Sequence, residues 1–280
     1  MTQFDRRAVL DIERLDGKAV RVESLRIAFT VEKTRTETAN RASIQVYNLA
    51  DTTREQILEK NARVILRCGY VEGTGDEVLF VGNAEFISHA RQFPSVITNI
   101  ETQDGVRELR EVRISVSFAA GATGAQVLRG VARQLGLPIR IFKEPSGTYP
   151  GGYAFAGPVG NSLDQITRRF GLEWSVQNGE LQIIEASGTT GEKAVVLTPD
   201  TGLIGSPERL QRTDGELDGE TETDPEWRVR CLLQPIILPG GIIELESAEV
   251  EGRFSVDRVL HSGDTRSDAW ESEVELRSLT

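Results

Sequence analysis

Apolar and polar residues alternate most clearly between positions 42 and 49. Ala42, Ile44 and Val46 lie on one face of an extended chain, and the residues between them are mostly polar. A period of two is the period of a β-strand. Because only one face begins apolar, we expect that face to pack on a core while the other carries polar atoms.

A short helix is predicted directly after this strand. Thr52 and Glu55 have the spacing of a capping box, in which the hydroxyl accepts a bond from a first-turn amide and the carboxylate reaches back to the cap. Ile57 and Leu58 would then dock the helix on the sheet. We therefore expect one strand, one tight corner and one short helix between residues 40 and 60.

The first 118 residues otherwise read as strands joined by short polar turns. With a single helix near its middle, this pattern is typical of a β-barrel or sandwich. The expected strands are Ala8–Leu15, Val20–Glu32, Arg63–Tyr70, Val78–Ala90, Ser95–Gln103 and Val106–Ser117.

Two helical patterns follow Ala119. The first, Thr123–Leu135, opens with a Thr123/Gln126 capping box and ends at Gly136. The second, Ser162–Phe170, has Ser162 and Gln165 at its start and Gly171 at its end. Each helix runs directly into a strand, so the sequence predicts two copies of a helix–glycine–strand unit.

A β-hairpin is predicted after the second unit. Asn178-Gly179 accepts positive φ at both turn positions and is flanked by alternating apolar residues. The stretch between the two helices, Pro145–Gly160, is rich in glycine, proline and aromatic residues and is expected to be a loop. Ala186–Lys193 is expected to be a flexible link.

Strand patterns return in the last third of the chain. The expected strands are Arg228–Leu233, Gly241–Glu246, Arg253–His261 and Trp270–Arg277. The predicted fold class is thus mainly β with a small α+β part. We expect a barrel domain at residues 1–118, a small α+β domain at 119–190 and a second barrel domain at 191–280.

Composition places the chain among ordinary globular proteins. Its 280 residues suffice for two or three domains with their own cores. No apolar run approaches the roughly 18 residues that cross a bilayer, and the N-terminal stretch lacks the apolar centre of an export signal. We expect no membrane anchor.

The charge argues against a surface that grips nucleic acid. Lys and Arg number 32 and Asp and Glu 43, for a formal charge of −11. A protein that binds DNA from outside usually presents a basic stripe, and none is visible. An acidic surface suits solubility, or a wall along which DNA slides without adhering.

The sequence predicts no metal site, catalytic centre or cofactor. Cys68 and Cys231 lie far apart, which favours two reduced, buried thiols over a disulfide or a zinc site. His261 and Asp264, with Asp257 nearby and His89 distant, lack the spacing of a metal site. We expect the His261 ring and Asp264 to bind loop backbone amides instead.

Acidic residues occupy every second position over one stretch of the last third. In an extended chain all seven would share one face and repel one another. Interspersed glycine and proline favour a solvated loop. The alternative is that several copies ring a conduit and keep passing DNA from adhering. The residues are Asp214, Glu216, Asp218, Glu220, Glu222, Asp224 and Glu226.

Enzyme motifs are missing as well. A glycosidase needs two carboxylates across a cleft, and Glu173, beside Trp174, is the best single candidate but has no evident partner. The sequence contains no G-x-S-x-G, H-E-x-x-H or complete phosphate-binding loop. We expect no enzymatic activity.

Two stretches nevertheless resemble a known family. The strand ending IQVYNL, followed by a polar turn and a short helix, is similar to the first domain of bacteriophage baseplate hub proteins. The stretch CLLQPIILPGGIIEL followed by GRFSVDRVLHSGDTRSDAWESEVEL is similar to the last domain of the same family. The residues that carry the resemblance are Ile44, Val46, Tyr47, Asn48, Leu49, Pro239, Gly240, His261, Gly263, Asp264 and Trp270.

The resemblance implies a structural role in a contractile phage tail. Two tail-tube-like barrels per chain would give a homotrimer a nearly sixfold ring that joins the sixfold tail tube to the threefold central spike. The partners implied are the tail tube protein, the spike protein, other baseplate proteins and phage DNA passing through the lumen without specific binding. The implied location is the virion baseplate, assembled in the bacterial host cytoplasm. Compared with larger hubs of the family, the chain is compact.

A second hypothesis is a tail component that binds or degrades the cell wall. The α+β domain would then bind glycan in a cleft lined by Tyr149, Tyr153, Phe155 and Trp174. Such a cleft would favour this hypothesis, whereas a large flat trimer interface would favour the hub.

Overall fold

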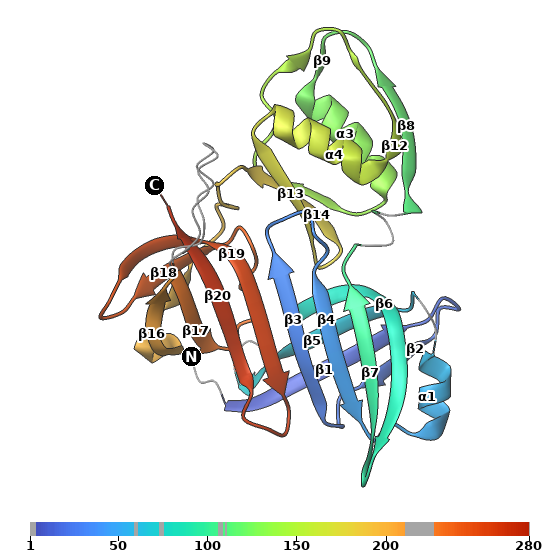
Figure 1. The fold of residues 1–280 in the computed structure, drawn as a ribbon, viewed down its shortest axis with the longest axis vertical. Helices are drawn as coiled ribbons and strands as arrows, with labels where there is room; N and C mark the ends of the chain where they lie inside the picture. The colour runs from blue at the N-terminus through green and yellow to red at the C-terminus, as the bar shows by residue number, and fades with distance from the viewer. Residues whose placement is uncertain are drawn as a thin grey trace.

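The fold is known from a computed structural model that describes residues 4–58, 61–72, 76–105, 109, 111–210 and 227–279. It confirms a mainly β chain with a small α+β part (Figure 1). We name three parts by their residues: the N-terminal part (4–105), the α+β part (113–186) and the C-terminal part (194–279).

The N-terminal part contains seven described strands and one helix. Its elements are β1 (Phe4–Glu13), β2 (Ala19–Val22), β3 (Ile27–Thr34), β4 (Arg41–Tyr47), α1 (Asp51–Ile57), β5 (Arg63–Glu72), β6 (Glu77–Gln92) and β7 (Ser95–Gln103).

The α+β part holds two longer helices and several short strands. Its elements are β8 (Arg113–Phe118), β9 (Ala122–Thr123), α3 (Gly124–Leu135), β10 (Ile139–Ile141), β11 (Thr148–Tyr149), β12 (Tyr153–Pro158), α4 (Val159–Arg169), β13 (Leu172–Gln177) and β14 (Glu180–Glu185).

The C-terminal part returns to strands. Its elements are β15 (Val195–Leu197), a short 3-10 helix η1 (Pro199–Thr201), β16 (Leu203–Arg209), β17 (Trp227–Leu232), β18 (Ile242–Glu246), β19 (Glu251–Asp264) and β20 (Trp270–Ser278).

One sheet runs through both the N-terminal and the C-terminal parts. Among the described residues it has the order β16-β17-β20-β19-β3-β4-β7-β6-β5-β1-β2, with β18 beside β19 and β15 beside β18. The two parts meet where β19 pairs antiparallel with β3, from Arg258 opposite Thr34 to Asp264 opposite Ala28. We call this ladder the β3–β19 junction. Figure 1 shows these strands side by side in front, with β1 and β5 crossing behind.

Three clusters of buried side chains form the core. The first lies within the N-terminal part but includes Leu233 and Trp270 from the C-terminal part. The second fills the α+β part between its helices and strands. The third lies in the C-terminal part. The face of β4 predicted to be apolar is buried, since Ala42, Ile44 and Val46 expose at most 1% of their surface.

Several local predictions are confirmed. Thr123 and Gln126 form the predicted capping box at the start of α3, and Gly136 ends that helix with a left-handed φ of 79°. Asn178 and Gly179 have φ of 55° and 79° in the hairpin between β13 and β14. The two helix–glycine–strand units are α3 with β10 and α4 with β13.

Other local predictions are wrong. The cap of α1 is Ala50, without a side-chain bond, so the Thr52/Glu55 capping box does not form. Ile57 is buried as expected, but Leu58 is half exposed. The helix α4 begins at Val159, which places Ser162 inside it. At Thr52 and Ser162, the tertiary packing of the helix determines where it begins, and a hydroxyl with capping-box spacing does not.

The predicted strand and loop boundaries also need correction. The strand predicted over Val20–Glu32 is interrupted between Val22 and Ile27. The loop predicted over Pro145–Gly160 contains β11 and β12, which pair with β9 and β8. The strand predicted from Val106 is found only from Arg113 on, and residues 106–108 and 110 lie outside the described residues.

Candidate functional site

Tyr47, Asn48 and Leu49, the YNL residues that end the IQVYNL stretch, connect the end of β4 to neighbouring elements. Asn48 has a left-handed φ of 59°, its amide donates to the Val96 carbonyl at 2.7 Å, and its Oδ1 accepts from the Val96 amide at 3.0 Å. An asparagine adopts this backbone conformation at lower cost than most residues. Leu49 and the β4 residues Ile44 and Val46 are buried in the core below.

Tyr47 connects this motif to the C-terminal part. The Arg26 guanidinium lies 4.4 Å from the centre of the Tyr47 ring and donates to Asp264, with the Nη2–Oδ2 distance at 2.6 Å. Its Nε contacts both Asp264 oxygens, at 3.1 and 3.2 Å. The Arg26 guanidinium and the Arg266 amide help to hold the pKa of Asp264 below its ordinary value, against the opposing effect of partial burial.

Gly263 and Trp270 determine the apolar packing at the β3–β19 junction. A Cβ at Gly263 would lie 2.3 Å from the Phe29 ring, so only glycine fits there without displacing that ring. Trp270 meets Phe29 edge to face with 5.6 Å between ring centres, and meets Tyr70 in the same way at 6.5 Å. Aromatic residues of both parts therefore share one core.

His261 is fully buried beside this cluster. Its Nδ1 lies 2.8 Å from the Ser272 hydroxyl, which is a side chain and not the loop backbone amide expected from the sequence. Asp264, by contrast, accepts from the Arg266 amide at 2.9 Å, as expected. Burial, aided by the positive charge of Lys33, lowers the pKa of His261 to about 3. The imidazole is therefore neutral at physiological pH. Among the described residues no group of three or more His, Cys, Asp and Glu could hold a metal ion.

The Pro239-Gly240 turn connects the C-terminal part to the α+β part. The Pro239 carbonyl accepts from Gln182 Nε2 at 3.1 Å, and the Gly240 carbonyl accepts from the Thr190 amide at 2.8 Å. Gly240 has a φ of 79° and its own amide donates to the Val256 carbonyl at 2.8 Å. The turn thus holds β14, the linking segment and β19 together.

Arg35, just after β3, lies where all three parts meet. It is only 5% exposed. Its Nε contacts Glu173 Oε2 at 2.5 Å, its Nη2 donates to the Glu185 carbonyl at 2.9 Å, and its Nη1 donates to Ser255 Oγ at 3.2 Å. One guanidinium therefore binds β13 and β14 of the α+β part and β19 of the C-terminal part.

A second buried cation, Lys33, lies on the same side of β3. It is fully buried and its Nζ donates to Asn178 Oδ1 at 2.8 Å, at the tip of the β13–β14 hairpin. Asp104 is also buried and accepts from the Gly179 amide at 2.9 Å. Burial lowers the pKa of Lys33 and raises that of Asp104, while their opposite charges act against both shifts.

Two amide side chains complete this contact. Asn40 Nδ2 donates to the Val176 carbonyl at 2.7 Å and to Gln177 Oε1 at 3.0 Å. Gln177 Nε2 donates to the Thr34 carbonyl at 2.8 Å. We call the set Lys33, Arg35, Asn40, Asp104, Glu173, Gln177 and Asn178 the polar junction. It attaches the α+β part to the sheet mainly through side chains.

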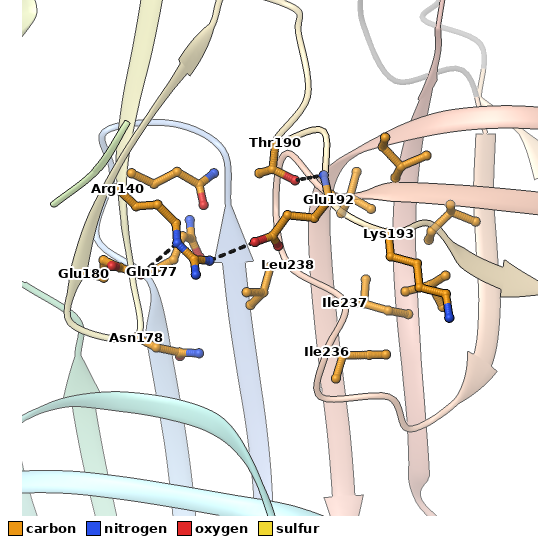
Figure 2. Close-up of a pocket in the computed structure, with 16 residues that line it drawn as sticks. Arg140, Gln177, Asn178, Glu180, Thr190, Glu192, Lys193, Ile236, Ile237 and Leu238 are labelled. Atoms are coloured by element: carbon orange, nitrogen blue, oxygen red, sulfur yellow. Dashed lines mark hydrogen bonds and ion pairs between the residues drawn. The ribbon is translucent and has the colours of Figure 1, made fainter. Parts of the chain in front are cut away.

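A cavity of about 170 Å³ lies beside the polar junction (Figure 2). Figure 2 shows Arg140 reaching from the α+β part toward Glu180 and Glu192, with Nη1 2.9 Å from Glu192 Oε1. Aliphatic residues Ile236, Ile237 and Leu238 form the opposite wall. The linking segment that holds Glu192 therefore closes one side of the cavity.

The aromatic residues proposed for a glycan cleft pack against other side chains. Tyr149 lies 5.1 Å from Tyr153 between ring centres, both belong to the core cluster of the α+β part, and Trp174 donates to Asp164 at 2.8 Å. Among the cavities found in the described residues, none is lined by these aromatic rings. Glu173, the best catalytic candidate, is paired with Arg35.

The remaining candidate residues are placed as follows. Cys68 and Cys231 are free and buried, and burial raises the pKa of both thiols. Asp257 pairs with Arg277 at 2.7 Å, and His89 Nδ1 lies 3.0 Å from Thr98 Oγ1. The seven acidic residues between Asp214 and Glu226 lie outside the described residues.

Sequence reasoning missed the polar junction, although a signal was present. Ile27, Phe29 and Val31 define the inward face of β3, and Lys33 and Arg35 continue that alternation. A charged residue at an inward position is either paired inside the protein or marks the place where the strand leaves the core, and only the structure distinguishes the two.

No helix within the described residues has the length and apolar character needed to span a membrane.

Comparison with known proteins identifies a family for the chain. The sequence matches the family model described as "Baseplate hub gp41" over residues 7–248. No match was found among curated protein sequences.

Solved structures with a similar fold come from phage-like tails. The prophage MuSo2 43 kDa tail protein from Shewanella oneidensis has a TM-score of 0.68 at 11% identity, with 98% of this chain and 97% of that chain covered. The tail protein from Neisseria meningitidis MC58 has a TM-score of 0.67 at 10% identity, with the same coverage.

A third similar structure belongs to a secretion system. The E. coli c3393 protein, described as a component of the type VI secretion system similar to the T4 bacteriophage tail proteins gp27 and gp5, has a TM-score of 0.61 at 12% identity. The alignment covers 97% of this chain and 77% of that one. At these identities the three structures establish a shared fold.

Proposed function

The chain belongs to the baseplate hub gp41 family, and we propose that it is a structural hub whose copies close into a homotrimeric ring between tail tube and central spike. The observation that carries this proposal is the single sheet through the N-terminal and C-terminal parts. Two strand-rich parts in each chain would give a trimer six strand-rich units, which suits a sixfold tube above and a threefold spike below.

Free strand edges support closure of the ring. Within the described residues, β2 ends the sheet on one side and β16 on the other. Unpaired edges in a monomer invite association with other strands, and ring closure would use them up. We divide the chain accordingly into tube-like domains at 1–118 and 191–280 and an α+β domain at 119–190.

We infer the partners from the membership of the baseplate hub family. The ring would contact the tail tube protein on one face, the spike on the other, and further baseplate proteins through the α+β domain. The T4 similarity described for the E. coli protein supports this arrangement. The hub would act without catalysis or cofactor, in the virion baseplate after assembly in the host cytoplasm. DNA would pass through its lumen.

Mass in solution tests the ring. Light scattering on the purified chain at several concentrations should show a species of three chains. A monomer at every concentration, also in the presence of the spike protein, would contradict the trimer.

The acidic run offers a separate test of the conduit. If three copies of residues Asp214 to Glu226 line it, changing the seven carboxylates to Asn and Gln should slow DNA ejection, because neutral walls repel the phosphates less. Ejection kinetics equal to those of the unmodified phage would contradict a role of the acidic run in the conduit, but would not contradict the proposed ring.

A further inference from the structure

The α+β part carries an open groove beside its first long helix, α3. It lies beside β9 and α3, in the part of the molecule that projects away from the sheet (Figure 1). One wall and the floor are apolar or small, and α3 forms the other wall. The lining residues are Phe118, Ala119, Ala120, Gly121, Ala122, Gln126, Arg129, Gly130 and Arg133.

Small residues give the groove its shape. A Cβ at Gly130 would lie 2.4 Å from the Phe118 ring, so glycine at this position lets that ring pack on α3. The neighbouring Ala119, Ala120 and Gly121 are exposed. Because these side chains are short, another backbone can approach the floor closely.

The groove is also basic. Arg129 and Arg133 lie one helical turn apart on its wall, and no acidic residue lines it. Arg129 pairs with Glu144, while Arg133 forms no ion pair within the described part of the chain. From β8 to Ala186 the sequence has seven basic and five acidic residues, whereas the remainder has 25 basic and 38 acidic. A copy of the same chain is therefore an acidic partner for this groove.

One protruding element of the C-terminal part has the complementary chemistry. The hairpin between β18 and β19 exposes Glu246, Glu249 and Glu251, and none of them forms an ion pair with another described residue. Glu246 lies directly opposite Glu251 in the ladder. Like charges in this position destabilise a hairpin, and a cationic partner would relieve the repulsion.

The tip of this hairpin is held in one conformation. Ser247 Oγ donates to the Val250 carbonyl at 2.9 Å and accepts from the Val250 amide at 3.0 Å. Its side chain also accepts from the Glu249 amide at 3.3 Å. A turn ordered before binding loses little entropy on docking. Ala248 adds a small apolar residue at the tip.

We propose that the β18–β19 hairpin of one copy docks into the α3 groove of the next copy. Ala248 contacts the alanine and glycine floor, and the hairpin carboxylates pair with Arg129 and Arg133. The contact joins two different surfaces, so repetition by rotation generates a ring. Closure at three copies rests on the proposed function. A hairpin tip covers less than the roughly 1,200 Å² typical of a stable interface, so the contact adds to the sheet contacts.

Cysteine crosslinking of the full-length chain tests this contact. A variant with Ala120→Cys and Ala248→Cys places one thiol on the floor and one at the tip without removing a charge, and the native cysteines are buried. Oxidation should give species linked up to three chains. Gln134→Cys with Ala248→Cys is the control, because Gln134 is exposed on α3 outside the groove lining. Equal yields from the two pairs would overturn the contact.

Charge exchange provides the second arm. Arg129→Glu with Arg133→Glu should lower the crosslinking yield at least tenfold, and adding Glu246→Lys with Glu249→Lys should restore it. Arg113→Glu with Arg168→Glu makes the same charge change elsewhere on the α+β part and should leave the yield unchanged. If light scattering shows a trimer for every variant and the crosslinking yield does not change, the docking alone is overturned. If every variant and the unmodified chain are monomers, the proposed ring is overturned as well.

Discussion

The β3–β19 junction and the polar junction join parts of the same chain by different physical means. At the first, seven opposed residue pairs form a backbone ladder, and Phe29, Tyr70 and Trp270 pack beneath it. At the second, Lys33, Arg35 and Asn40 supply much of the contact through their side chains. The first resembles the interior of a domain, and the second resembles an interface.

This difference separates stability from orientation. Apolar burial and a continuous ladder contribute to the unfolding free energy of the sheet. Buried ion pairs and hydrogen bonds contribute less net stability, because desolvation offsets their attraction. They form only when the two parts are held in one relative orientation. We therefore expect damage to the β3–β19 junction to unfold the sheet, and damage to the polar junction to release the α+β part.

The largest expected effect is at Trp270. Trp270→Ala removes a buried indole shared by the N-terminal and C-terminal parts and should lower the unfolding free energy by about 3–5 kcal/mol. Urea unfolding followed by circular dichroism measures this loss. Phe86→Ala, at a side chain that is 62% exposed, should cost less than about 0.5 kcal/mol. Similar losses for the two variants would contradict a shared core.

Arg35→Ala should act on the polar junction alone. It leaves Glu173, the Glu185 carbonyl and Ser255 without their buried partner, at a cost of about 1.5–3 kcal/mol. Hydrogen exchange should accelerate in β13 and β14 and stay unchanged in the β3–β19 junction. Arg140→Ala removes a half-exposed ion pair and serves as the control. Equal acceleration in the sheet would show that the two junctions are not independent.

Acid should weaken the β3–β19 junction through His261. Its pKa in the folded chain is about 3, below the ordinary 6.5, so the unfolded chain binds a proton first as the pH falls. The contribution of neutral His261 to the unfolding free energy is fully present above pH 6.5. It declines below that pH, by about 2 kcal/mol at pH 5. His261→Gln should flatten the dependence of urea midpoint on pH, whereas His89→Gln should change it little because His89 is less buried. Parallel pH profiles for wild type and His261→Gln would exclude this role.

The smallest expected effect concerns the Arg26–Asp264 pair. Asp264→Asn keeps the shape of the side chain but removes its charge, and should cost about 1 kcal/mol because Arg26 is 39% exposed. A double-mutant cycle with Arg26→Met isolates the pair. A coupling energy near zero would mean that Asp264 acts through backbone amides such as that of Arg266, from which it accepts a hydrogen bond at 2.9 Å.

Much of the fold could be predicted from local patterns. The alternation in β4, the capping box at Thr123 and the Asn178-Gly179 turn are set by neighbours in sequence, and all three are confirmed. The failed capping boxes at Thr52 and Ser162 have the same spacing as the successful one. Spacing alone does not tell where packing will begin a helix.

The junctions could not be predicted, because their partners are far apart in the chain. Lys33 and Asn178 are separated by 145 positions, and Arg26 and Asp264 by 238. The residues that suggested the family, among them Gly263, Trp270 and Gly240, were recognised by resemblance. The structure adds the physical reason for these three residues, since each of them lies at a contact between parts.

The β3–β19 ladder also determines how the chain responds to mechanical force. In an antiparallel pair the backbone bonds run perpendicular to the strands. A pull that slides β19 along β3 therefore loads all seven opposed pairs together, whereas a pull that peels one strand away loads them in turn. The sheet is consequently strongest against shear along its strands, the direction in which rupture requires all of these bonds to fail at once.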